Sequence, residues 1–259
     1  MPVFCRDGKM IHFIHIPKCA GGSIEHLLLS EGWETPAEYN EGVGKHACRE
    51  EWKKLESRLK SRGEMWEYQF ATVRNPYDKL ESRYWQNRRE FRGRPLVTGL
   101  VDDYEVYSRK NLPPVPSAMP QDVNLGFPCY GSVIDFLNRI AYMLFISLRD
   151  EGPSVDNNHW LPQHRFVDPD THLFKLEQVE LVLDALRAKG YISEDSELPH
   201  LRHKNRASDN IHDPPGPELS LNVPWCSPDI RDIHEKVLEV YGKDFELFGY
   251  IPEVTRATS

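Results

Sequence analysis

The chain has 259 residues, a length that suits one large domain better than two full ones. Its 39% hydrophobic and 28% charged residues are typical of a folded globular protein and exclude a largely disordered chain. With 32 basic and 40 acidic residues the formal net charge is −8, which argues against a dedicated binder of nucleic acid or of heparin-like polyanions.

Strands and helices alternate along much of the chain. In chain order the sequence predicts strand 10–16, helix 24–30, loop 33–45, helix 47–61, strand 68–73, helix 77–91, helix 134–148, strand 171–175, helix 178–189, loop 193–224, helix 229–241 and an apolar anchor at 245–250. This alternation implies a central parallel sheet flanked by helices on both faces, an α/β fold. Residues 93–130 hold six prolines and no sustained period, so we expect one domain over 1–259 with a long irregular insert there.

Targeting and redox signals point to the cytoplasm. The longest apolar run, Ile140–Ile146, is far shorter than the roughly 20 residues that span a membrane, and the polar N-terminus has no signal-peptide core. The five cysteines are an odd number and widely spaced, which excludes a disulfide scaffold and a cysteine zinc site. We expect a cytoplasmic protein with no membrane partner, and the sequence leaves its oligomeric state open.

The segment His15–Ile24 (HIPKCAGGSI) carries the first chemical signal. A glycine pair between a predicted strand and a predicted helix lets several N–H groups point at one spot, where the helix N-terminus and Lys18 add positive charge. These features predict a phosphate or sulfate cradle. The lysine precedes the glycines, so the segment is not a Walker A loop, and an ordinary strand-to-helix turn with a solvated lysine is the alternative interpretation.

The segment Phe70–Ser82 (FATVRNPYDKLES) carries the second signal. Arg74 follows the buried strand 68–73 at the edge where open α/β sheets bind ligands, and Ser82 lies about two helical turns further on. A guanidinium and a hydroxyl that converge suit a second phosphate. Taken alone, Arg74 equally suits a helix cap or a surface ion pair.

These two segments in this order resemble the nucleotide-binding motifs of sulfotransferases that use 3′-phosphoadenosine 5′-phosphosulfate, above all the carbohydrate and uronosyl 2-O-sulfotransferases with their bacterial relatives. The resemblance covers most of the chain except 93–130 and implies a P-loop-like three-layer fold. It assigns the 5′-phosphosulfate to Lys18, Cys19, Ala20, Gly21, Gly22 and Ser23, and the 3′-phosphate to Arg74 and Ser82, with help from Lys204, Asn205 and Arg206. Related loops often carry Thr or Ser where Cys19 and Gly22 stand, so we expect an altered donor affinity here.

A base is needed to take the proton of the acceptor hydroxyl. The resemblance places the catalytic histidine at His46, just before the helix 47–61, and an imidazole with a pKa near 6.5 suits that role. His159 and His164, in the stretch 156–164, either line the acceptor site or pack within a loop. No spacing of histidines predicts a metal site, so no metal is expected.

The sequence therefore predicts an O-sulfotransferase in which Lys18 stabilises the leaving phosphate and His46 is the base. The acidic charge favours a small metabolite or carbohydrate acceptor over a long sulfated glycan. Two other classes stay open. The first is a nucleotide-dependent kinase, and the second is a non-catalytic nucleotide-binding module.

Overall fold

The computed structural model describes residues 3–90, 158–198 and 231–252. Within them one sheet has the strand order β1-β2-β3-β4. The pairs β2–β3 and β3–β4 are parallel, whereas β1 is antiparallel to β2, so the sheet is mixed around the predicted parallel part. The strands are β1 (Val3–Arg6), β2 (Lys9–Ile14), β3 (Tyr68–Val73) and β4 (His172–Lys175).

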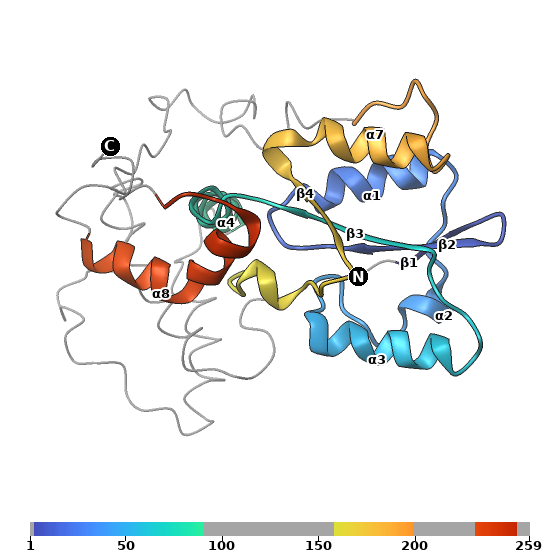
Figure 1. Cartoon of the computed structure of the whole chain (residues 1–259), viewed down its shortest axis with the longest axis horizontal. Helices are drawn as coiled ribbons and strands as arrows, with labels where there is room; N and C mark the ends of the chain where they lie inside the picture. The colour runs from blue at the N-terminus through green and yellow to red at the C-terminus, as the bar shows by residue number, and fades with distance from the viewer. Residues whose placement is uncertain (1–2, 91–157, 199–230, 253–259) are drawn as a thin grey trace.

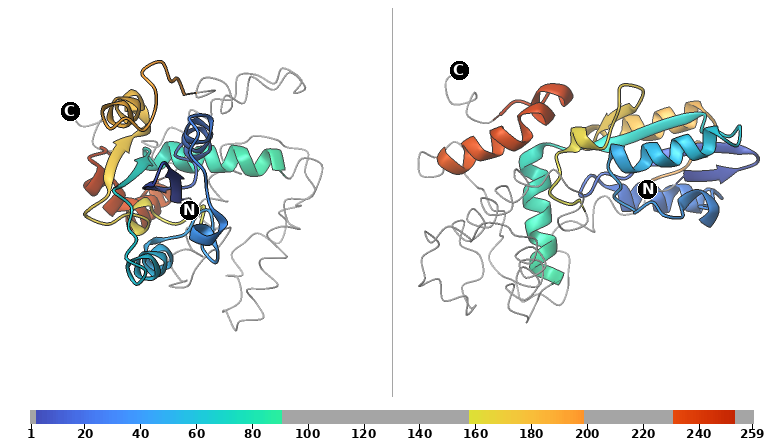
Figure 2. Two further views of the ribbon diagram at one scale, coloured as in Figure 1. Left: turned by 90° about the vertical axis from the view of Figure 1, so that its right-hand side faces the viewer. Right: turned by 90° about the horizontal axis from the view of Figure 1, so that it is seen from below.

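Helices cover both faces of the sheet in three layers, which confirms the predicted α/β class (Figure 1). One face carries α1 (Gly21–Ser30) and α7 (Glu180–Ala188), and the other carries α2 (Ala37–Asn40) and α3 (Arg49–Lys60). Two more helices, α4 (Pro76–Glu90) and α8 (Arg231–Phe248), lie beyond the carboxyl ends of the parallel strands. Figure 2 shows α4 running across the strand direction. Two short 3₁₀ turns complete the described part, η1 (Gln163–Arg165) and η2 (Leu176–Gln178).

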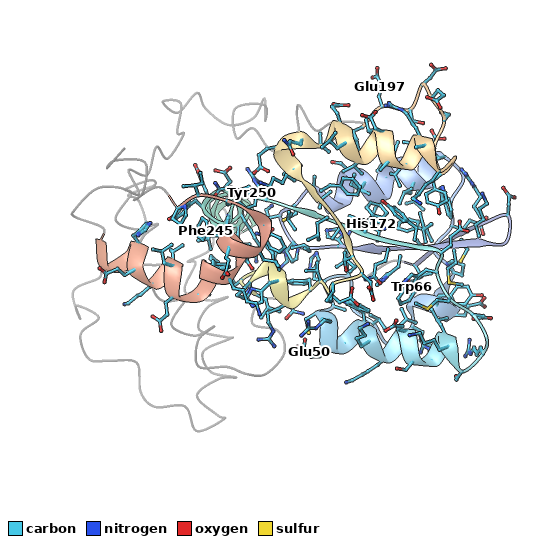
Figure 3. The ribbon with its side chains drawn as sticks, viewed as in Figure 1. Glu50, Trp66, His172, Glu197, Phe245 and Tyr250 are labelled. Atoms are coloured by element: carbon cyan, nitrogen blue, oxygen red, sulfur yellow. The ribbon has the colours of Figure 1, made fainter. Side chains whose placement is uncertain are left out.

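The inner strand β3 and most of β2 are buried on both faces, because successive side chains point to opposite layers, whereas β4 is exposed or half-buried. On β2, Phe13 packs into the cluster under α1 and α7, and its neighbour Ile14 packs into the cluster on the α3 side. Trp52 of α3 and Trp66, which Figure 3 labels on the same side of the sheet, fill that second cluster. The two apolar cores fix the strands and thereby the loops that follow their carboxyl ends.

The structure has an N-terminal β-hairpin that was not predicted from the sequence. β1 and β2 pair with Arg6 opposite Lys9, and the two turn residues, Asp7 and Gly8, have φ angles of 51° and 76°. Such a two-residue turn matches the right-handed twist of a hairpin, and an Asp-Gly pair is its usual sequence. The Asp-Gly pair therefore indicated a hairpin turn. The charged residues on either side of it interrupt the apolar pattern from which a strand is predicted.

Two other predictions need correction. The loop 33–45 contains the short helix α2, and the last helix does not end at 241 but continues to Phe248. Gly242 favoured the earlier end because glycine costs about 1 kcal/mol inside a helix. The burial of Asp244 and Phe245 keeps the backbone helical, so tertiary packing outweighs local propensity. The predicted insert 93–130, the helix 134–148 and most of the loop 193–224 lie outside the described residues.

Candidate active site

The turn between β2 and α1 presents backbone N–H groups at a helix N-terminus. Lys18 and Ala20 have left-handed φ angles of 67° and 60°, each costing a residue other than glycine about 1–3 kcal/mol. Within the described residues, the amides of Ala20, Gly21 and Gly22 have no hydrogen-bond acceptor, whereas the Ser23 amide donates to the Ala20 carbonyl at 2.9 Å. The first turn of α1 carries no acidic side chain. These N–H groups and Lys18 form what we call the anion cradle, which suits a phosphate or sulfate.

Arg74 lies next to the anion cradle at the carboxyl end of β3. Its Nη1 is 3.5 Å from the carbonyl oxygen of Lys18, so the two sequence motifs meet. The following residue, Asn75, caps α4 by accepting the Tyr77 amide at 3.0 Å on its side-chain oxygen, so Arg74 is not the cap. Ser82 is partly buried on α4, two turns beyond Arg74. The described contacts bring Arg74 to the anion cradle, and the pairing of Ser82 with a phosphate stays a prediction.

Three imidazoles gather beside the anion cradle, and we call them the histidine trio. The ring of His46 lies edge-on to those of His15 and His159, with centroid distances of 4.9 Å and 4.6 Å. The Nδ1 atom of His46 is buried and has no hydrogen-bond partner among the described residues. A Cβ atom placed on Gly21 would lie 2.2 Å from His15 Nε2, so the trio contacts the first turn of α1 directly.

The neighbours of the trio hold it in place. His15 Nδ1 lies 2.6 Å from a carboxylate oxygen of Glu25, whose other oxygen accepts from Lys45 Nζ at 2.6 Å. The side-chain amide of Asn158 donates to the His46 carbonyl at 2.8 Å. The buried ammonium of Lys79 donates to the His159 carbonyl at 2.9 Å, so each member of the trio is fixed from a different element.

Burial and nearby positive charge favour the neutral form of these imidazoles. Burial, aided by the positive charges of His15, His159 and Lys45, lowers the pKa of His46 to about 3. Burial also lowers the pKa of His15, although the Glu25 carboxylate opposes that shift. At neutral pH both rings are therefore unprotonated, which is the form that a base needs, although the low pKa makes His46 a weak base in this state.

Residues 2–251 match the model described as "Sulfotransferase family". The chain belongs to the sulfotransferase family. No curated protein and no solved structure matches the sequence of this sulfotransferase, so its carbohydrate or uronosyl subtype stays a resemblance. The family match includes the anion cradle, Arg74 and the histidine trio.

The two glycines of the sulfotransferase cradle have different surroundings, which gives a test of the packing. We expect Gly21→Ala to lower the free energy of unfolding by about 1–3 kcal/mol, because the new methyl group would overlap the His15 ring. Gly22→Ala is the matched control, since a Cβ at Gly22 meets no atom within 4 Å. Urea unfolding without nucleotide measures both. Equal stability of the two variants would contradict the contact between His15 and the cradle.

Cys19 lies beneath the cradle. Its side chain is buried, with Sγ 3.2 Å from the side-chain oxygen of Gln163, and its carbonyl accepts a hydrogen bond from the Thr72 hydroxyl. Burial raises the pKa of the Cys19 thiol to about 12, so the group is a neutral donor. A hydroxyl at this position would also point beneath the loop. The difference at Cys19 therefore removes no side-chain contact with an anion, and an effect on affinity is expected from Gly22 instead.

His164 does not join the trio, whereas its neighbour Gln163 lies beneath the cradle beside Cys19. His164 Nδ1 is 2.7 Å from Asp244 of α8, and no described contact joins His164 to the trio. Of the two histidines predicted near the acceptor, only His159 thus lies beside His46. Gln163 was not predicted as a site residue, although it stands between them in the sequence, because its partners are distant along the chain.

Several expectations are not tested by the described residues. Lys204, Asn205 and Arg206 lie outside them. In the described ranges no group of three or more His, Cys, Asp or Glu side chains is arranged to bind a metal ion, and the expectation of no metal stays a prediction. Among the same residues, no helix combines the length and apolar character needed to cross a membrane.

Proposed function

We propose that this sulfotransferase transfers the sulfuryl group of 3′-phosphoadenosine 5′-phosphosulfate to a hydroxyl group of a small metabolite or carbohydrate. The observation that carries the proposal is the meeting of the anion cradle, Arg74 and the histidine trio at the carboxyl edge of the parallel strands. This edge is where open α/β sheets bind their ligands. An anion site with a neutral imidazole beside it suits transfer of a charged group to an alcohol.

The donor would bind through two anionic ends. The amides of the cradle and the Lys18 ammonium suit the 5′-phosphosulfate, and Arg74 with Ser82 suits the 3′-phosphate. Lys18 would neutralise the charge that develops on the leaving phosphate oxygen as the sulfur–oxygen bond breaks. Catalysis would then consist mainly of positioning and charge stabilisation.

The acceptor side would depend on His46. As the acceptor oxygen forms its bond to sulfur, its proton would pass to the neutral imidazole, and adenosine 3′,5′-bisphosphate would leave. His159 contacts His46 edge-on and has its backbone carbonyl held by Lys79, so it suits a place at the acceptor edge. His164 is less suited to contact the acceptor, because its ring pairs with Asp244.

Titration calorimetry with adenosine 3′,5′-bisphosphate tests the donor, with ATP and AMP as controls. Tight binding of the bisphosphate and weak binding of both controls are expected, because only the bisphosphate presents a phosphate to Arg74. Equal binding of AMP would contradict the assignment of Arg74 and Ser82. Preference for ATP would favour the kinase alternative, and bisphosphate binding without any turnover would favour a non-catalytic module.

A further inference from the structure

Gln163 is a fully buried glutamine whose side-chain amide bonds to the same peptide segment twice. Its Oε1 atom accepts the Arg74 amide at 2.8 Å, and its Nε2 atom donates to the Arg74 carbonyl at 2.7 Å. The same Oε1 lies 3.2 Å from Cys19 Sγ, the neutral thiol beneath the anion cradle. One side chain therefore touches both loops that carry the predicted phosphate contacts.

The position of Arg74 explains why such a bond is needed. The ladder between β3 and β4 ends with Val73 opposite Lys175, so Arg74 is the first residue without a ladder partner in the described sheet. The amide of Gln163 supplies the donor and acceptor that a neighbouring strand would supply. It thereby extends the ordered backbone of β3 by one residue.

Gln163 itself is held from α8. Its backbone amide donates to Oδ2 of Asp244 at 2.7 Å, and the next amide, of His164, donates to Oδ1 at 2.9 Å. Asp244 is completely buried. Gln163 is thus anchored independently of the two loops that it joins, and a buried side chain whose oxygen and nitrogen are both hydrogen-bonded is held rigidly.

We propose that Gln163 is a positioning residue that holds Arg74 and the anion cradle in register, so that both phosphates of a 3′,5′-bisphosphorylated nucleotide bind together. This inference rests on the proposed donor. Two further contacts span the same gap, from Arg74 Nη1 to the Lys18 carbonyl and from the Thr72 hydroxyl to the Cys19 carbonyl. Gln163 is the residue that fixes the Arg74 backbone from which the guanidinium extends.

The test compares Gln163→Leu with the wild type by titration with adenosine 3′,5′-bisphosphate and with AMP. In the variant we expect the preference for the bisphosphate over AMP to fall about tenfold or more, as for loss of a positioned bond to a charged group. Gln69→Leu is the matched control, because Gln69 is also buried and bonds to Asp168 and Thr171 at the start of β3, away from Arg74. It should lower stability and leave the preference unchanged.

The outcomes separate the two proposals. No preference for the bisphosphate in the wild type would overturn the proposed donor. A wild-type preference that survives in Gln163→Leu, or that falls equally in Gln69→Leu, would overturn only the role of Gln163. If Gln163→Leu does not fold, Gln163→Glu tests the proposal in its place. Its carboxylate can still accept the hydrogen bonds of the Arg74 amide and the Cys19 thiol, but it cannot donate to the Arg74 carbonyl. The preference should fall several-fold there, and full retention would contradict the proposal.

Discussion

Lys18→Ala is expected to lower turnover by about two or more orders of magnitude. Lys18 belongs to the turn that leads into α1, and from there its ammonium would stabilise the leaving phosphate. An exposed lysine elsewhere gives the comparison: Lys60→Ala removes a cation that pairs only with Glu56 on α3 in the described contacts, and should leave turnover unchanged. Steady-state kinetics with 3′-phosphoadenosine 5′-phosphosulfate as the donor measures both.

Backbone strain at the same position allows the charge to be separated from the fold. Because Lys18 has a φ of 67°, Lys18→Gly removes the ammonium and also relieves an unfavourable conformation. We expect this variant to unfold at a urea concentration no lower than the wild type and yet to be as inactive as Lys18→Ala. Near-normal turnover in either variant would remove Lys18 from the proposed mechanism.

The sequence predicted those parts of the fold in which local pattern and tertiary packing agree. The strand 68–73 has its predicted bounds because six consecutive residues are buried between two helical layers. The helix 47–61 was found from Trp52, Leu55 and Leu59 on one face and is observed as α3, over 49–60. Prediction and structure differ where tertiary packing outweighs helix propensity, as at Gly242. They also differ where charged residues interrupt the pattern of a strand, as in β1.

The candidate site likewise contains residues that the sequence predicted and residues that it did not. Lys18, Arg74 and His46 could be predicted because motifs place them at the ends of recognisable strands or helices. Gln163 and Asp244 could not, because their function arises from contacts between residues that are 89 and 81 positions apart in the sequence. A polar residue shows its role in sequence only when its partners are near along the chain, and these two have none there.

His46→Ala should lower turnover by about two or more orders of magnitude and largely spare nucleotide binding, since the imidazole would act on the acceptor. His26→Ala is the control, because His26 is exposed on α1 and lies outside the histidine trio. Kinetics gives the first effect and calorimetry with adenosine 3′,5′-bisphosphate the second. Near-normal turnover of His46→Ala would exclude it as the base, and a parallel loss of nucleotide affinity would indicate a role in the donor site.

The low pKa of His46 makes its environment testable by pH. The ring has a pKa of about 3 when folded against about 6.5 when unfolded, so the unfolded chain binds more protons and stability falls as the pH drops from 6.5 toward 3. His46→Gln should lose less stability over that range, as urea unfolding at several pH values would show. A bound nucleotide adds negative charge beside the trio and should raise the pKa of His46 toward the range useful for a base. An NMR titration of its ring protons, with and without adenosine 3′,5′-bisphosphate, would contradict this arrangement if the pKa stayed the same, because an imidazole near the cradle must respond to the charge that the cradle binds.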